Sequence, residues 1–187
     1  MKIATILVTN KHITLKKIFF LVLYKFLFKH FPTSQNLLFG KLSKWCRYQC
    51  CKRIFKSCGK EVNIERGADF GAGFEIEIGN YSGLGINCRV PSNILIGSYV
   101  MMGPNCYILD SNHEFGDTEK PMMFQGHLPK MKTIIGNDVW IGRDVLMTPG
   151  RTIADGCIIA AGCVLTKDFE PFSIVGGNPS KFIKSRK

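Results

Sequence analysis

A six-residue repeat restricts the fold of this chain more than any other feature of its sequence. Aliphatic residues stand at every sixth position in two blocks: Ile78, Leu84, Val90, Ile96, Met102 and Ile108, then Ile135, Ile141, Met147, Ile153, Ile159 and Leu165. A period of six matches neither an α-helix, with 3.6 residues per turn, nor a simple strand, with two. It predicts short strands joined by sharp turns, with three strands in each coil of a solenoid. The coils must stack to bury their apolar sides.

Small residues accompany the aliphatic positions. The residue after the aliphatic one is often Gly or Ala, and the fifth residue of most repeats is small or β-branched. Four cysteines take that fifth place: Cys88, Cys106, Cys157 and Cys163. We expect them to be inward-facing wall residues rather than catalytic thiols. An earlier group keeps the same spacing two positions out of phase and is expected to form the first coil: Ile64, Phe70 and Ile76.

The other four cysteines precede the repeat: Cys46, Cys50, Cys51 and Cys58. They have neither paired CxxC spacing nor a nearby histidine, so we expect no zinc site among them. Cys46 and Cys50 lie four residues apart and would share one face of a helix as small packing residues.

The net charge of +11 comes from one end of the chain. Residues 1–60 contain 13 Lys or Arg and no Asp or Glu, whereas residues 61–187 contain 12 Lys or Arg and 14 Asp or Glu. A basic surface over the whole protein is therefore excluded. The cationic residues 1–60 could still contact a nucleic acid, but they contain no recognition motif, so we expect no nucleic-acid partner. We divide the chain into a basic, mostly helical segment (1–60), the solenoid (61–175) with a loop at 114–134, and a basic C-terminal tail (176–187).

The longest apolar run, residues 18–28 (IFFLVLYKFLF), lies in the basic segment and contains Lys25. Eleven residues are too few to cross a bilayer, which takes about 20, and Lys29 and His30 follow where a signal peptide has small residues. The run fits a helix that packs on the rest of the protein or on a partner subunit. It also fits a helix lying in a headgroup layer. We expect a cytoplasmic protein, which in the second case is peripheral on the inner membrane face.

The repeat resembles that of the hexapeptide acyltransferases, whose fold is a left-handed parallel β-helix. Within that group, residues 78–184 look like the sugar O-acetyltransferase branch, which includes maltose and galactoside enzymes. The chain also resembles capsular or exopolysaccharide acetyltransferases. Three motifs carry the resemblance: IGNDVWIG (135–142), AAGCVLTKD (160–168) and VGGNPSKFIK (175–184). The resemblance implies transfer of an acetyl group from acetyl-CoA to a saccharide hydroxyl, by a homotrimer with active sites between chains.

His113 stands where the first repeat block meets the loop, and its spacing from Pro104 and Asn105 matches the catalytic histidine of the resembling family. A hydroxyl is a poor nucleophile until its proton leaves, and an imidazole can take that proton near neutral pH. The resemblance therefore implies that His113 is the general base of a direct transfer without an acyl-enzyme. Asp110 either orients this imidazole or caps the turn.

The resemblance also implies a track for coenzyme A along the coils. Five residues would lie beside the pantetheine arm: Gly142, Arg143, Ala161, Thr166 and Lys167. Lys181 and Lys184 match basic positions that meet the nucleotide phosphates, and a solvated basic C-terminus is the alternative. Gly142 is in addition a candidate donor to the oxyanion formed on the thioester carbonyl.

The acceptor is less well indicated than the donor. Trp140 resembles an aromatic that packs beside the active site, with ordinary core packing as the alternative. The family often has an Asn in the acceptor pocket where this chain has Gly83, Leu84 and Gly85. This departure argues against a maltose or galactoside enzyme. If the basic segment binds an anionic leaflet, a lipid-linked glycan precursor becomes the expected acceptor.

Two other functions remain open at this point. One is acetylation of an antibiotic of the streptogramin or chloramphenicol type, which shares the fold and the histidine. The other is a non-catalytic β-helix scaffold. We expect no metal, because a zinc-dependent carbonic anhydrase on a similar solenoid needs three histidine ligands, and the solenoid with its loop contains only His113 and His127.

Overall fold

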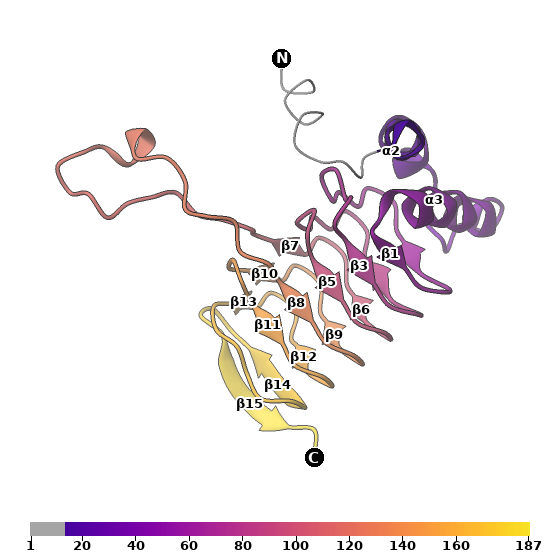
Figure 1. The fold of residues 1–187 in the computed structure, drawn as a ribbon. Coiled ribbons are helices and arrows are strands. Elements are labelled where there is room, and N and C mark those ends of the chain that lie inside the picture. Colours follow the sequence, from indigo (N-terminus) through magenta and orange to yellow (C-terminus); the bar gives the residue numbers. More distant parts are fainter. Residues whose placement is uncertain (1–13) are drawn as a thin grey trace.

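The computed structural model describes residues 14–187 as a parallel β-solenoid with a helical cap at one end (Figure 1). The cap contains helix α2 (Leu15–Phe26), the short 3-10 helix η1 (Phe28–His30) and helix α3 (Gly40–Ile54). The side chain of Thr14 begins α2 by accepting a hydrogen bond from the N–H of Lys17. The part of the predicted helical segment that precedes Thr14 lies outside the described residues.

Strands of two residues make up the coils, as the repeat predicts. They are β1 (Ser57–Cys58), β2 (Asn63–Ile64), β3 (Glu77–Ile78), β4 (Gly83–Leu84), β5 (Leu95–Ile96), β6 (Met101–Met102), β7 (Tyr107–Ile108), β8 (Ile134–Ile135), β9 (Trp140–Ile141), β10 (Leu146–Met147), β11 (Thr152–Ile153), β12 (Ile158–Ile159) and β13 (Val164–Leu165). Two longer strands, β14 (Ser173–Gly176) and β15 (Lys181–Ser185), close the C-terminal end as an antiparallel pair. Residues 181–185 of the predicted basic tail therefore form a strand.

The strands of successive coils stack in parallel on three faces (Figure 1). The first face has the order β1-β3-β5-β8-β11, and the third has β7-β10-β13. The second face contains β2-β4 and then β6-β9-β12-β14, with β15 at its edge. Aliphatic residues pair with aliphatic residues across coils, as Ile78 does with Ile96 and Ile96 with Ile135. All twelve repeat positions and the four wall cysteines are buried, so the predicted solenoid is confirmed.

The first coil exists with the predicted offset of two positions, but Ile76 is not one of its aliphatic positions. Cys58 pairs with Ile78 and Ile64 with Leu84, each 20 residues apart, where Ile78 and Ile96 in the next coils are 18 apart. Ile76 then takes the place of a fifth-position wall residue. The extra two residues lie in the turn after Phe70, where Gly71 and Gly73 both have positive φ. A Cβ on Gly73 would lie 2.7 Å from the Phe70 ring, so this wide turn depends on glycine.

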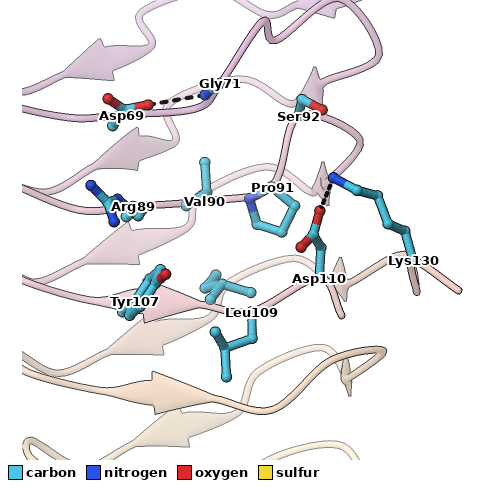
Figure 2. Close-up of a pocket in the computed structure, with 11 residues that line it drawn as sticks. Asp69, Gly71, Arg89, Val90, Pro91, Ser92, Tyr107, Leu109, Asp110 and Lys130 are labelled. Atoms are coloured by element: carbon cyan, nitrogen blue, oxygen red, sulfur yellow. Dashed lines mark hydrogen bonds and ion pairs between the residues drawn. The ribbon is translucent and has the colours of Figure 1, made fainter. Parts of the chain in front are cut away.

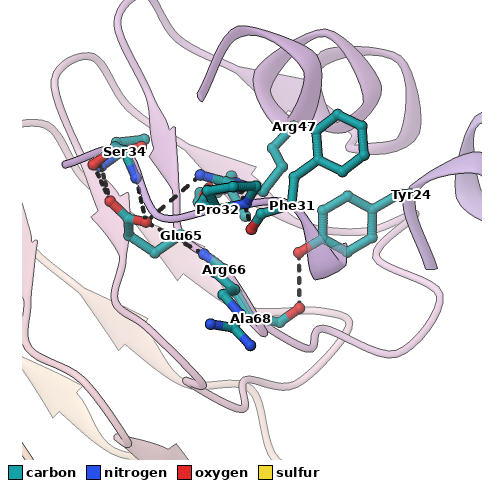
Figure 3. Close-up of polar contacts among 10 residues, drawn as sticks. Tyr24, Phe31, Pro32, Ser34, Arg47, Glu65, Arg66 and Ala68 are labelled. Atoms are coloured by element: carbon teal, nitrogen blue, oxygen red, sulfur yellow. Dashed lines mark hydrogen bonds and ion pairs between the residues drawn. The ribbon is translucent and has the colours of Figure 1, made fainter. Parts of the chain in front are cut away.

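The buried Arg47 of α3 attaches the cap to the first coil (Figure 3). Its guanidinium donates hydrogen bonds to the carbonyl oxygens of Ile64, Phe31 and Pro32, and one of its nitrogens lies 3.6 Å from a carboxylate oxygen of Glu65. Burial lowers the pKa of Arg47, and the charge of Glu65 opposes this effect. The cap is therefore joined to the coil by a buried polar network as well as by apolar packing.

The insertion between β7 and β8 is a two-stranded arm that projects away from the solenoid (Figure 1). The N–H of Leu109 still donates to Met147 in the coil. Beyond it, backbone bonds join Met131 to Asp110 at 2.7 Å and Leu128 to Asn112 at 2.9 Å. The 3-10 helix η2 (Met122–Phe124) lies near the tip. Residues 110–113 thus belong to the arm together with most of the predicted loop at 114–134.

The apolar cap does not provide a membrane span. Within residues 14–187, every helix is too short or too polar to cross a bilayer.

Cys46 and Cys50 are both buried on α3, in agreement with the predicted shared helix face.

Candidate active site

The arm places His113 directly opposite a second histidine. His113 and His127 form an antiparallel bridge, and their ring centroids are 4.3 Å apart with an angle of 35° between the planes. Both residues are exposed. The position of His113 is therefore set by pairing within the arm, and its imidazole is open to solvent.

A cavity of about 240 Å³ lies at the base of the arm, on the third face of the solenoid (Figure 2). Asp110 and Lys130 close one side of it, with Lys130 Nζ 2.5 Å from Asp110 Oδ2. On the other side the Arg89 guanidinium lies over the ring of Tyr107, 5.4 Å from its centroid. Within residues 14–187, the Asp110 carboxylate accepts from Lys130 and Ser111 and makes no hydrogen bond to His113.

Three of the predicted coenzyme A residues meet at one edge of the solenoid, between the second and third faces. A Cβ on Gly142 would lie 2.5 Å from the backbone nitrogen of Ala161, so the two coils touch backbone to backbone. The N–H of Gly162 donates to the Arg143 carbonyl at 2.9 Å. Among residues 14–187, the N–H groups of Arg143 and Ala161 have no acceptor. This edge therefore offers free backbone donors.

Gly142 does not match its second predicted role. Its N–H donates to the carbonyl of Ile159 at 2.8 Å, which is a regular bond between coils. A donor already engaged in the solenoid cannot also stabilise an oxyanion. The sequence could not reveal this, because any glycine at a turn offers an N–H until its partner is known.

Thr166 and Lys167 lie at the next edge of the solenoid, after the third face. The N–H of Thr166 donates to the hydroxyl of Ser180, and the N–H of Ser180 donates to Val164. The turn between β14 and β15 is thereby folded over β13. Lys167 lies 5.4 Å from the centroid of the Phe169 ring and lines a separate surface cavity of about 490 Å³.

The two C-terminal lysines extend along β15. Lys181 pairs with Gly176 and Lys184 with Ile174 of β14, and both side chains are exposed. Strand β15 begins directly after Ser180, whose hydroxyl accepts a hydrogen bond from Thr166. The predicted coenzyme A residues therefore form three groups rather than one compact pocket: the Gly142 edge, the Thr166 edge and β15.

Trp140 is not a core residue. It lies on the outer surface of the second face, 51% exposed, with Met101 and Ile158 as its strand neighbours. Further along this face, a cavity of about 470 Å³ lies over Gly83, which has no side chain to fill it. Glu65 and Tyr81 line the cavity together with Ser34 of the cap.

Several polar groups near these sites were missed from the sequence: His127, Lys130, Arg89 and Ser180. His127 lies inside the loop predicted at 114–134, and nothing in the sequence indicated that its ring meets that of His113. No periodic signal marks the other three. Among residues 14–187, no group of three or more His, Cys, Asp or Glu side chains is arranged to hold a metal ion.

Comparison with known proteins agrees with this architecture. Residues 132–167 match the bacterial transferase hexapeptide family (six repeats). A chloramphenicol acetyltransferase from Agrobacterium fabrum is 33% identical over 159 residues, which is 82% of this chain and 69% of that protein.

Two solved structures share the fold over most of the chain. A maltose O-acetyltransferase from Clostridium difficile 630 has a TM-score of 0.73 and 29% identity, and the match covers 92% of this chain and 87% of that one. A galactoside acetyltransferase in complex with coenzyme A has a TM-score of 0.74 and 25% identity, with 95% and 86% covered.

Proposed function

The chain belongs to the hexapeptide-repeat acetyltransferases, and from this premise we propose that it transfers the acetyl group of acetyl-CoA to a hydroxyl group of a saccharide. The main support for a saccharide acceptor is the extent of the structural match with two sugar acetyltransferases. The maltose and galactoside enzymes cover 92% and 95% of the chain, a share that must include much of the helical cap.

In the proposed reaction His113 is the general base. Its imidazole removes the proton from the acceptor hydroxyl as the oxygen attacks the thioester carbon. The new C–O bond forms, the C–S bond breaks, and coenzyme A leaves as the thiolate, which takes up a proton. Support comes from the exposure of the imidazole on the arm. We retain Asp110 as a residue that positions His113 indirectly. Its ion pair with Lys130 joins the two strands of the arm where the arm leaves the solenoid.

Acetyl-CoA would extend along the edge formed by Gly142, Arg143 and Ala161. The free N–H groups of Arg143 and Ala161 can donate to the amide carbonyls of pantetheine. Thr166 and Lys167 would lie further along this route, and Lys181 and Lys184 would face the phosphates. We place Trp140 beside the acceptor, because its exposed ring offers an apolar surface to a sugar.

We propose a homotrimer for the active assembly. The arm exposes Phe115, Met122, Met123 and Phe124, and a large apolar tip of this kind is usually covered by a partner. Closed rotational symmetry is the common form of such assemblies. In this arrangement the arm of one subunit would bring His113 to the coil edge of the next.

We propose a surface glycan, such as a capsule or exopolysaccharide precursor, as the acceptor. The resembling family often has an acceptor-binding Asn in the region of Gly83 to Gly85, and the cavity that these residues line is open. A wider site fits a larger acceptor than a free disaccharide. A lipid-linked precursor would fulfil this condition.

Acetyl-CoA turnover against a panel of acceptors tests the proposal. The panel contains neutral oligosaccharides, acidic oligosaccharides, lipid-linked glycans, chloramphenicol and a streptogramin, with the acetylated product identified by mass. We expect the highest kcat/KM for a glycan. The identity to a chloramphenicol acetyltransferase favours an antibiotic as the second candidate, and faster turnover of chloramphenicol than of every glycan would establish it. Failure to bind acetyl-CoA at all would indicate a scaffold.

Replacing Lys181 and Lys184 together by alanine is expected to raise KM for acetyl-CoA about tenfold, with little change in kcat. Each ammonium would contribute a charge-assisted contact to a phosphate, and about 1.4 kcal/mol corresponds to a factor of ten. Lys52→Ala, on the exposed side of α3, is the control and should leave KM unchanged. Equal KM values for the double variant and the wild type would remove both lysines from the donor site.

A further inference from the structure

Helix α2 has two apolar sides, and only one of them is used by the fold. On the inner side Tyr24 is buried and donates its hydroxyl hydrogen to the carbonyl oxygen of Ala68 at 2.7 Å. The outer side contains four residues at helical spacing that are 50% to 86% exposed: Leu15, Phe19, Val22 and Phe26. Spacing of four, three and four residues aligns them in one stripe. The helix is thus anchored on one side and free on the other.

A second exposed apolar group belongs to the same cap. It includes the segment before α3 and the first two turns of that helix: Leu37, Leu38, Phe39, Leu42 and Trp45. Each of these side chains is more than half exposed. Single exposed apolar residues are ordinary, but nine of them concentrated in one small cap mark an interaction surface.

The charge of the cap indicates what this surface meets. Lys29 pairs with Asp69 of the coil, and Lys44 pairs with Glu61. Five further cations of α2 and α3 have no acidic partner among residues 14–187: Lys16, Lys17, Lys41, Lys52 and Arg53. Residues 1–60 contain no Asp or Glu at all. Two copies of such a segment repel one another, so a second copy of this chain is a poor partner for it.

We propose that the outer surface of the cap docks on a bilayer that contains anionic lipids. Phe, Leu and Trp side chains on one side of a helix, with Lys around them, are typical of helices that lie in the headgroup region. The twelve residues of α2 span about 18 Å, which is shorter than the roughly 30 Å of a hydrocarbon core, so the helix lies on the membrane and does not cross it.

Docking of this kind leaves the solenoid intact. Tyr24 and Arg47 hold the inner side of the cap on the first coil, through Ala68 and Glu65 (Figure 3). The outer side is therefore available without any rearrangement. The cap lies at the end opposite β14 and β15 (Figure 1). The membrane would then contact the N-terminal end of the solenoid, whatever the acceptor of the enzyme is.

Co-sedimentation of the full chain with vesicles tests the proposal. One set of vesicles contains only phosphatidylcholine, and the other also contains phosphatidylglycerol. We expect binding to the anionic set to be at least about tenfold stronger, and to weaken at about 0.5 M salt, where charges are screened within a few Å. No binding to the anionic vesicles at low salt, or equal binding to both sets, overturns the proposal.

Two variants separate the apolar stripe from general adhesion. Phe19→Ser with Phe26→Ser should lower binding about tenfold or more, because two aromatic side chains no longer enter the headgroup region. Tyr81→Ser with Tyr99→Ser removes two exposed aromatic rings from the coil and should leave vesicle binding unchanged. Unchanged helix content and unchanged turnover of a freely dissolved acceptor would show that the Phe19 and Phe26 variant is folded.

A second variant, which changes charge only, tests the proposal if the Phe19 and Phe26 variant fails to fold. Lys16→Gln with Lys41→Gln keeps every apolar side chain and should lower binding to anionic vesicles several-fold, with a weaker salt dependence. Light scattering in the absence of vesicles completes the test. If the Phe19 and Phe26 variant changes the oligomeric state and the wild type does not bind vesicles, the surface is an interface between copies and the proposal is wrong.

Discussion

Replacing His113 by alanine is expected to lower kcat for acetyl transfer by about 10²- to 10⁴-fold, which is the usual contribution of a positioned general base. The imidazole is exposed on the arm and contributes nothing to the buried core, so the thermal stability of the variant should stay close to that of the wild type. Steady-state kinetics with the best acceptor of the panel, together with a thermal melt, measure both quantities.

His127→Ala is the matched control for this variant. It removes the same side chain from the opposite strand of the arm, where the ring contacts His113 but has no assigned role in proton transfer. We expect its effect on kcat to be far smaller. Full activity of the His113 variant, or equal losses in the two variants, would mean that the base is a different group.

Replacing Arg47 by alanine is expected to reduce the free energy of unfolding by about 3–5 kcal/mol, the usual range for breaking a buried ion pair by removing one partner. The carbonyl oxygens of Ile64 and Pro32 would lose their donor. Burial would raise the pKa of Glu65, but hydrogen bonds from Ser34 and Asn63 outweigh it and keep that pKa below its usual value. The carboxylate would therefore stay charged at neutral pH without its partner.

Arg53→Ala controls for the loss of an arginine from the same helix. Its guanidinium is exposed and lies 4.9 Å from the centroid of the Phe20 ring, a contact that contributes about 0.5–1 kcal/mol. Urea unfolding at a fixed protein concentration measures both variants, and limited proteolysis reports whether the cap is released first. If the two variants lose the same free energy, Arg47 is not what joins the cap to the coil.

The regular part of the fold could be predicted well because its order is local. A residue such as Ile96 stacks on Ile78 and beneath Ile135, and each of these contacts follows from the repeat once three strands form a coil. The burial of Cys88 and its equivalents follows in the same way. Where two residues were added to a turn, at Gly71 to Gly73, the same reasoning assigned Ile76 to the wrong position.

The site was predicted less completely, because its residues meet through segments that have no period. The sequence placed His113 at the end of a repeat block, but its contact with His127 depends on how the arm pairs with itself. Whether Asp110 faces an imidazole or Lys130 depends on the same pairing. The N–H of Gly142 was a candidate donor to the oxyanion, and only the stacking of the next coil shows that this N–H already donates to the Ile159 carbonyl.

The sequence by itself determined that this chain forms a stacked solenoid with a separate cationic segment, since a six-residue period and a charge distribution are properties of the chain alone. The tertiary structure decided which side of α2 packs and which stays open, and what His113, Asp110 and Trp140 contact. Those outcomes depend on contacts between segments distant in sequence, where the free energy of packing, rather than a local pattern, selects the arrangement.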